Sequence, residues 1–228
     1  MNIDHQLYYL LAMLFSVLGP FALSFDKKVN FKQYFKFLMK SIPLVAIFFM
    51  AGDIFYTQLG VWGFNPSYHL PFKIYNLPIE EISFFLVVPY ACIFIYECLR
   101  GYFKIDFGTK QYPILAIIFV LMIVGFVITF GKLYTSATLL GSIAILGYIY
   151  CKQPQYTSYL LVAYLISIIP FMMVNGFLTG CCLPQPIVWY NDFAIVGIRA
   201  ISIPIEDFSY SFNLISLNIM AFEYFKSK

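Results

Sequence analysis

The sequence predicts an all-α membrane protein in which seven transmembrane helices form two parallel three-helix repeats joined by a linking helix. Three observations support this fold class: an apolar composition, seven apolar stretches of membrane-spanning length, and an internal repeat. Of the 228 residues, 61% are hydrophobic and 11% are charged, whereas soluble domains carry about 25% charge. We therefore expect a surface that mostly faces lipid, and the net charge of +3 gives no reason to expect a nucleic-acid partner.

The seven stretches are each close to the length that a helix needs to cross a bilayer, which is about 20 apolar residues. Segments with Pro, Gly, Lys or Asn-Pro separate them, as is typical of loops. The predicted helices are residues 7–25, 38–58, 79–99, 113–131, 134–151, 157–178 and 205–225. No small-residue cleavage site follows the first stretch, so we expect a retained helix and not a signal peptide.

Lysine and arginine residues are divided unequally between the two sides of the predicted bundle. Eleven of the 14 lie in the first, third and fifth connections and in the C-terminal tail, and three lie on the other side. The positive-inside rule places the richer side in the cytoplasm. We therefore expect a multi-pass protein of a bacterial or archaeal cytoplasmic membrane, with its N-terminus outside and its C-terminus inside.

The internal repeat is clearest at the starts of the third and seventh stretches. Residues 77–84 read Leu-Pro-Ile-Glu-Glu-Ile-Ser-Phe, and residues 203–210, 126 positions later, read Ile-Pro-Ile-Glu-Asp-Phe-Ser-Tyr. The same offset pairs Glu97 with Glu223. Three spans leave the chain on the opposite side of the membrane, so the fourth helix lets the second repeat insert in the same orientation. The expected units are a first repeat at 1–105, a linking helix at 106–132 and a second repeat at 133–228.

Both repeats therefore open a helix with a Pro-Ile-acid-acid motif. Proline and acids suit the first turn of a helix and its dipole, so helix-end chemistry could explain the motif without any function. A functional role is favoured because two acids stand where one would serve, both copies keep the pair, and the flanks are apolar. Carboxyl groups are costly within a membrane protein and are commonly functional there. The predicted catalytic residues are Glu80, Glu81, Glu206 and Asp207.

Adjacent acids on a helix point about 100° apart, so only one acid of each pair can face the interior directly. Glu80 and Glu206 each precede an aromatic residue by four positions, Phe84 and Tyr210. This spacing favours Glu80 and Glu206 as the inward acids, with the second acid of each pair at the rim or bound to a neighbouring helix. The sequence leaves open whether each repeat forms its own site or both build one.

Other candidates lie at the same outer side. With small gaps, residues 52–53 align with 174–175, and residues 61–62 align with 188–189. The loop at 60–66 reads Gly-Val-Trp-Gly-Phe-Asn-Pro, and its aromatic groups suit either an interfacial belt or a lid over a pocket that stabilises a cation. The predicted substrate-binding residues are Asp53, Trp62, Phe64, Asn65, Phe84, Asn175, Trp189 and Tyr210.

The remaining polar residues point away from several other functions. Neither the five cysteines nor the lone His5 and His69 have metal-ligand spacing, so we expect no metal. No Gly-x-Gly-x-x-Gly follows a predicted strand, which argues against a dinucleotide fold. Glu97 and Glu223 each precede a cation by three residues, Arg100 and Lys226, and suit intrahelical salt bridges of little energetic weight.

At these residues the chain resembles the membrane-type lycopene (carotenoid) cyclase family, whose two units can be separate subunits or, as here, one fused chain. The resemblance covers nearly the whole chain. It rests on Asp53, residues 60–66, residues 77–85, the Gly-Ile-Arg at 197–199 and the Pro-Ile-Glu-Asp at 204–207. One departure from the family pattern is the Cys-Cys-Leu-Pro-Gln-Pro segment at 181–186.

The resemblance implies conversion of the linear ψ ends of lycopene to β rings, giving γ-carotene or β-carotene. A proton adds to a terminal double bond, a neighbouring double bond attacks the resulting cation, and a proton leaves. Because a σ bond replaces a π bond, no redox cofactor is consumed, and we expect no cofactor. We expect a lipophilic carotenoid and membrane lipid as partners, with Glu80 or Glu206 as proton donor and another acid as acceptor.

Two alternatives remain at this point. A related enzyme could act on another carotenoid or form another ring type, because the ring type depends on which proton leaves. A membrane carrier with two pseudo-symmetric halves is the non-enzymatic alternative, although it predicts acids deep within the helices and not near their starts. The sequence leaves the oligomeric state open.

Overall fold

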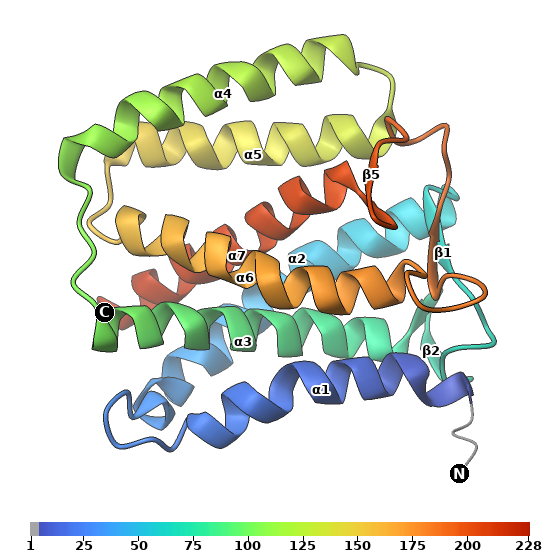
Figure 1. The fold of residues 1–228 in the computed structure, drawn as a ribbon, viewed down its shortest axis with the longest axis horizontal. Coiled ribbons are helices and arrows are strands. Elements are labelled where there is room, and N and C mark those ends of the chain that lie inside the picture. Colours follow the sequence, from blue (N-terminus) through green and yellow to red (C-terminus); the bar gives the residue numbers. More distant parts are fainter. Residues whose placement is uncertain (1–4) are drawn as a thin grey trace.

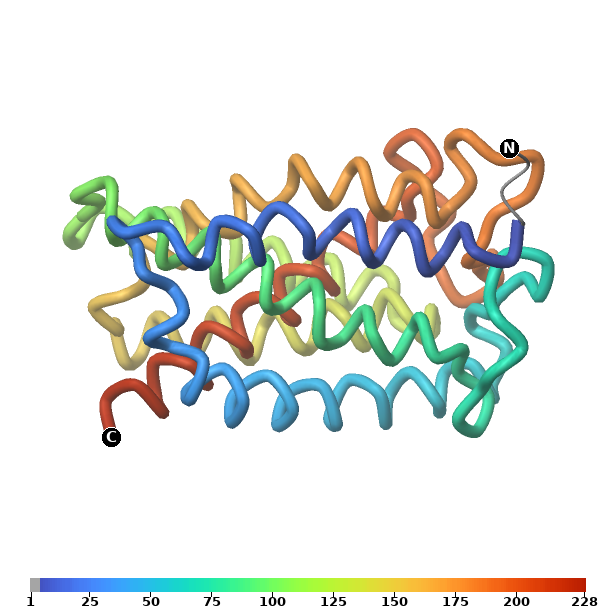
Figure 2. Tube along the Cα trace, turned by 90° about the horizontal axis from the view of Figure 1, so that it is seen from below, coloured from blue at the N-terminus to red at the C-terminus, as the bar shows by residue number. Residues whose placement is uncertain are grey.

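The computed structural model describes residues 5–228, which form a bundle of seven long helices with short strands at one end (Figure 1). Each predicted stretch corresponds to one helix, with ends shifted by a few residues. The helices are α1 (Tyr8–Leu23), α2 (Phe35–Gln58), α3 (Ile79–Tyr102), α4 (Gln111–Ile128), α5 (Leu133–Lys152), α6 (Thr157–Leu178) and α7 (Ile205–Lys226). The start of α1 lies at the end with the strands, and α7 ends at the opposite end of the bundle (Figure 2).

Six of these helices, α1 to α6, are long and apolar enough to span a membrane within residues 5–228. Helix α7 is more polar because it packs against α2, α3, α5 and α6. Its Asn213 side chain accepts a hydrogen bond from Ser142 at 2.8 Å and donates one to the Thr138 carbonyl at 2.9 Å. Polar side chains within a membrane bundle are tolerated where neighbouring helices satisfy them.

The strands form three small antiparallel pairs. Strand β2 (Lys73–Ile74) pairs with β3 (Leu77–Pro78), and β5 (Arg199–Ala200) pairs with β6 (Ile203–Pro204). Each of these hairpins turns through two residues, and the first of them, Tyr75 or Ile201, has a positive φ of 55° or 61°. The two residues lie 126 positions apart, so the repeat preserves even the strained conformation of the turn.

The third pair, β1 (Trp62–Phe64) with β4 (Val188–Tyr190), joins the two repeats. Its hydrogen bonds continue symmetrically, because the Asn65 amide donates to the Ile187 carbonyl at 2.8 Å and the Asn191 amide donates to the Val61 carbonyl at 2.9 Å. The repeats are therefore related by an approximate two-fold axis that passes near the centre of this strand pair.

This symmetry corrects the expected alignment of the loops by one residue. Val61 corresponds to Ile187, so Gly63, and not Trp62, is the counterpart of Trp189. Gly63 and Trp189 face each other at the centre of the strand pair. A Cβ atom on Gly63 would overlap the Trp189 indole, so a large residue fits in only one of the two positions.

The opposite end of the bundle is held by a cluster of four charges. The expected intrahelical pairs are present, with N···O distances of 3.6 Å for Arg100–Glu97 and 3.9 Å for Lys226–Glu223. The closer pairs cross between the repeats: Arg100 binds Glu223, and Lys226 binds Glu97 at 2.6 Å. The same residues that suit helix-internal salt bridges therefore connect α3 to α7.

Candidate active site

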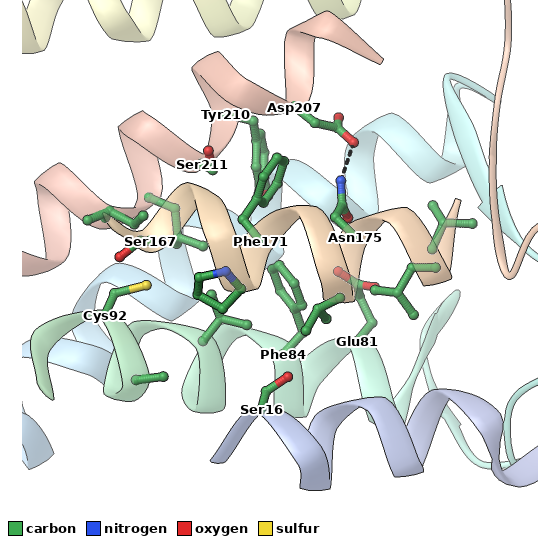
Figure 3. Close-up of a pocket in the computed structure, with 18 of the residues that line it drawn as sticks. Ser16, Glu81, Phe84, Cys92, Ser167, Phe171, Asn175, Asp207, Tyr210 and Ser211 are labelled. Atoms are coloured by element: carbon green, nitrogen blue, oxygen red, sulfur yellow. Dashed lines mark hydrogen bonds between the residues drawn. The ribbon is translucent and has the colours of Figure 1, made fainter. Parts of the chain in front are cut away.

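A cavity of about 270 Å³ lies inside the bundle and reaches the strands β1 and β4 at one end of it (Figure 3). Apolar and aromatic side chains form most of its lining, and three carboxyl groups join them. These are Asp53 from α2, Glu81 from α3 and Asp207 from α7. The two repeats therefore contribute acids to one shared cavity.

The first acid of each pair has a different position. Glu80 accepts a hydrogen bond from the Leu70 amide at 2.8 Å, and Glu206 accepts one from the Val196 amide at 2.7 Å. Both side chains are buried, with 1% and 2% exposure. Glu206 also accepts a hydrogen bond from Thr135 at 2.6 Å. These acids attach the preceding loop to the helix start in each repeat.

The expectation that Glu80 and Glu206 face the interior was therefore wrong. Phe84 lies four residues after Glu80 but also three after Glu81, and both spacings share a helix face. The aromatic neighbours at 84 and 210 consequently do not distinguish the acids of a pair. The loop amides orient the first acid, and this leaves the second acid of each pair on the cavity.

Tyrosine hydroxyl groups bind both of the inward acids. Tyr9 from α1 donates a hydrogen bond to the Oε2 atom of Glu81. Tyr134 from α5 donates to the Oδ1 atom of Asp207 at 2.6 Å. The backbone amides of Tyr9 and Tyr134 also bind matching carbonyls, Tyr68 and Ala194, so the two tyrosines are counterparts in the repeat.

Within residues 5–228, Asp207 has two more donors, and Glu81 has none equivalent to them. The Asn175 side chain donates to Oδ2 of Asp207 at 2.7 Å, as Figure 3 shows, and Tyr190 donates to the same oxygen at 2.9 Å. Burial, reinforced by the nearby Asp207, raises the pKa of the Tyr190 phenol well above its ordinary value. Tyr190 therefore keeps its proton and remains a donor at physiological pH.

Asp53 occupies the position in α2 that Asn175 occupies in α6. The Trp62 indole nitrogen donates to its Oδ1 atom at 2.8 Å. Its Oδ2 atom is buried and has no hydrogen-bond partner among residues 5–228. The first repeat thus places a carboxyl group where the second places an amide, so the cavity is chemically asymmetric at the end near β1 and β4.

Aromatic rings surround the acids. The ring centroids of Trp62 and Tyr134 lie 4.9 Å apart, and those of Tyr134 and Tyr190 lie 5.9 Å apart. Tyr210 also approaches Tyr134, at 6.1 Å. Because aromatic faces carry partial negative charge, such a lining can stabilise a cation that has no water around it.

The cavity includes most of the residues that the sequence indicated. The predicted residues that line it are Asp53, Trp62, Phe64, Glu81, Phe84, Asn175, Asp207 and Tyr210. Asn65 instead binds Gln185 at 3.1 Å, and Trp189 is 43% exposed above Gly63. Those two residues, together with Glu80 and Glu206, are outside the cavity lining.

Sequence reasoning missed the tyrosines Tyr9, Tyr134 and Tyr190. Tyr8–Tyr9 and Tyr134 stand at the starts of the first and fifth helices, at nearly the repeat offset, and this was the available signal. The chain contains 19 tyrosines, so their presence alone selects none of them.

A groove between α1 and α6 adjoins the cavity and shares Phe15 and Val174 with it. Its lining residues are Tyr8, Leu11, Ala12, Phe15, Met173, Val174 and Phe177. Phe15 and Met173 are about two-thirds exposed, at 63% and 60%. Among the described residues, no group of three or more His, Cys, Asp or Glu side chains is placed to hold a metal ion.

The family model described as lycopene cyclase matches the chain twice, over residues 5–99 and 131–225. The two matched segments correspond to the two three-helix repeats, and α4 lies between them. No match is found among curated proteins or solved structures. Because the family model covers most of the sequence, the chain belongs to the lycopene cyclase family and carries two copies of the family's unit.

Proposed function

We propose that this carotenoid cyclase is a lycopene β-cyclase in which one active site, built by both repeats, closes the linear ends of lycopene. The observation that carries the proposal is the convergence of Glu81 and Asp207 on one apolar, aromatic cavity. A lipophilic polyene requires such a cavity, and an acid-initiated isomerisation requires carboxyl groups within it.

Glu81 is the proposed proton donor. A buried carboxylate needs several hydrogen-bond donors to replace water, and Glu81 receives one, from Tyr9. Asp53 is close to the same end of the cavity, and two neighbouring buried acids disfavour a state in which both are ionised. These surroundings favour a neutral acid within the Glu81–Asp53 pair, which is the species that can protonate an alkene, and we assign this role to Glu81.

Asp207 is the proposed carboxylate. It accepts hydrogen bonds from Tyr134, Tyr190 and Asn175. Three donated hydrogen bonds stabilise the ionised form of a buried acid. An amide always donates through its nitrogen, so Asn175 supports the charged form of Asp207. In this proposal the Asp207 carboxylate balances the charge of the carbocation and accepts the departing ring proton, and Glu81 regains its proton from solvent.

The proposed reaction balances without a co-reactant. The Glu81 proton and the terminal π bond form a C–H bond, which leaves a tertiary cation. The neighbouring double bond supplies the electron pair of the new ring bond, and loss of a ring proton restores an alkene. The product is an isomer of the substrate. The rings of Trp62, Tyr134 and Tyr210 stabilise the intermediate cation while the apolar lining excludes water.

We propose that the substrate enters the cavity from the lipid bilayer. The groove between α1 and α6 gives a lateral path from the bilayer, past Phe15 and Val174, to the acids. The cavity volume of about 270 Å³ lies just below the range of about 300–1,000 Å³ for small-molecule sites, so it suits part of a long polyene. We retain the proposed orientation in which the end of the bundle with the acids is outside.

Expression in bacteria engineered to accumulate lycopene tests this function. Chromatography of the extracted pigments is expected to show γ-carotene, β-carotene or both, and neither should form in cells with an empty vector. Unchanged lycopene, in cells whose membranes contain the folded protein, would contradict lycopene as the substrate. Rings of another type would identify the correct cyclase reaction.

A further inference from the structure

The cavity occupies one of two positions that the repeat makes equivalent. It lies along α3 and α6, with α7 beside them. The approximate two-fold axis relates this region to the space between α7, α2 and α3. Buried side chains fill that second space, and they are Val45, Ala46, Phe49, Phe85 and Leu214.

The counterparts of these residues follow from the offsets within the repeat. Helices α3 and α7 correspond with an offset of 126, as Glu81 and Asp207 show, so Phe85 corresponds to Ser211. Helices α2 and α6 correspond with an offset of 122. Asn76 donates to the Ile54 carbonyl at 3.0 Å, and its counterpart Ser202 donates to the Gly176 carbonyl at 3.1 Å.

The key difference between the two spaces is a phenyl ring in one and a hydroxymethyl group in the other. Phe85 is fully buried, and its ring lies 6.3 Å from that of Phe49. Ser211 lines the cavity beside Phe171, the counterpart of Phe49, and its hydroxyl turns back to the Phe208 carbonyl at 2.9 Å. A buried phenylalanine side chain removes about 150–250 Å² of surface from solvent, so a serine in its place leaves considerable space open.

A second difference between the repeats also opens space in the cavity. Val45 belongs to the filled cluster, whereas its counterpart Ser167 lines the cavity. Ser167 and Ser211 lie on facing helices, deeper in the bundle than the acids (Figure 3). Ser211 follows Asp207 by four residues, or about 6 Å along the helix axis.

The cavity is elongated along α3. On α3 the lining extends from Glu81 to Ile95, a separation of 14 positions, or about 21 Å along the helix. Apart from the hydroxyls of Ser16, Ser167 and Ser211 and the thiol of Cys92, the deep lining is apolar. A linear polyene held by its reacting end at Glu81 would extend along this channel.

We propose that Ser211, supported by Ser167, determines substrate length by keeping open the channel for the polyene chain behind the reacting end group. This inference rests on the proposed cyclase function. A phenylalanine at position 211 would occupy the channel as Phe85 occupies the equivalent space. A substrate short enough to end before Ser211 would still reach the acids.

Competition between long and short substrates in membranes or detergent tests the proposal. Lycopene and a chain-shortened acyclic polyene with the same ψ end group would be supplied to the wild type and to Ser211→Phe. The kcat/KM for lycopene is expected to fall about tenfold or more, and that for the short substrate is expected to fall much less. Leu165→Phe is the matched control, because Leu165 lies on α6 near Ser167 but is 61% exposed on the surface of the bundle.

Equal kcat/KM ratios in Ser211→Phe and the wild type would overturn the inference, whether the absolute rates fall or not. If Ser211→Phe does not fold, Ser167→Val narrows the same channel with the residue that the other repeat already uses. It should lower the lycopene rate relative to the short-substrate rate, and an unchanged ratio would also overturn the proposal. Failure of the wild type to cyclise either substrate would instead contradict the proposed function.

Discussion

Glu81 and Asp207, which the repeat places 126 residues apart, line the same cavity from α3 and α7. Their hydrogen-bond partners differ, with one donor to Glu81 and three donors to Asp207. Two acids of common origin thus lie in different environments, and this difference is the basis for assigning them different roles.

Replacement of Glu81 by Gln is expected to abolish ring formation, because a glutamine amide supplies no proton. The expected loss is about 100- to 10,000-fold in kcat, the usual contribution of a general acid. Glu80→Gln is the matched comparison: it weakens the acceptor for the Leu70 amide and should lower thermal stability more than it lowers turnover. A larger loss of turnover in folded Glu80→Gln than in Glu81→Gln would reverse the assignment.

Replacement of Asp207 by Asn removes the negative charge. It also replaces one of the two carboxylate oxygens, which together accept three hydrogen bonds, with an amide nitrogen. We expect a loss of more than about 100-fold in kcat, since each unpaired buried donor costs about 1–3 kcal/mol. Tyr190→Phe removes a single donor to this acid, and it should lower kcat by about tenfold. Steady-state rates with lycopene measure both effects, and full activity of Asp207→Asn would refute its role as the carboxylate.

A single shared cavity also has a kinetic consequence. Only one end of lycopene can meet Glu81 at a time, so a bicyclic product requires two binding events. Monocyclic γ-carotene is expected to appear first in a time course and to decline as β-carotene forms. Chromatography of timed samples measures this order. Bicyclic product without any free monocyclic intermediate, at a large excess of lycopene, would indicate that both ends react without release.

The protein is expected to remain active when its two repeats are produced as separate polypeptides. Residues 1–105 and 106–228, produced as two polypeptides, are expected to cyclise lycopene together, and neither is expected to do so alone. Strands β1 and β4 pair across the repeats, and Arg100–Glu223 and Lys226–Glu97 connect their other ends. Keeping α4 on the second polypeptide preserves its insertion direction. Ring formation by one half alone would contradict a site built by both.

The fold could be predicted because its signals are carried by many residues at once. Apolar stretches gave the seven helices to within a few residues, and the offset of 126 gave the repeat. The polar character of α7 has a structural cause that sequence does not reveal: neighbouring helices surround Asn213 and satisfy it.

The site was predicted only in part, because side-chain direction depends on the rotation of each helix. The motif identified both acid pairs, but the Leu70 and Val196 amides determine which acid faces inward. These amides belong to loops without a distinctive pattern. Likewise, Tyr9 and Tyr134 reach the acids only because α1 packs against α3, and α5 against α7.

The origin of the incoming proton tests the central claim most directly. Purified protein equilibrated in D₂O and given lycopene is expected to place one deuterium in each new ring, as the Glu81 proton exchanges with solvent before each turnover. Mass spectrometry of the separated products measures this uptake, and products formed in H₂O provide the reference. Rings that form in D₂O without deuterium would contradict a cyclisation started by a protein acid.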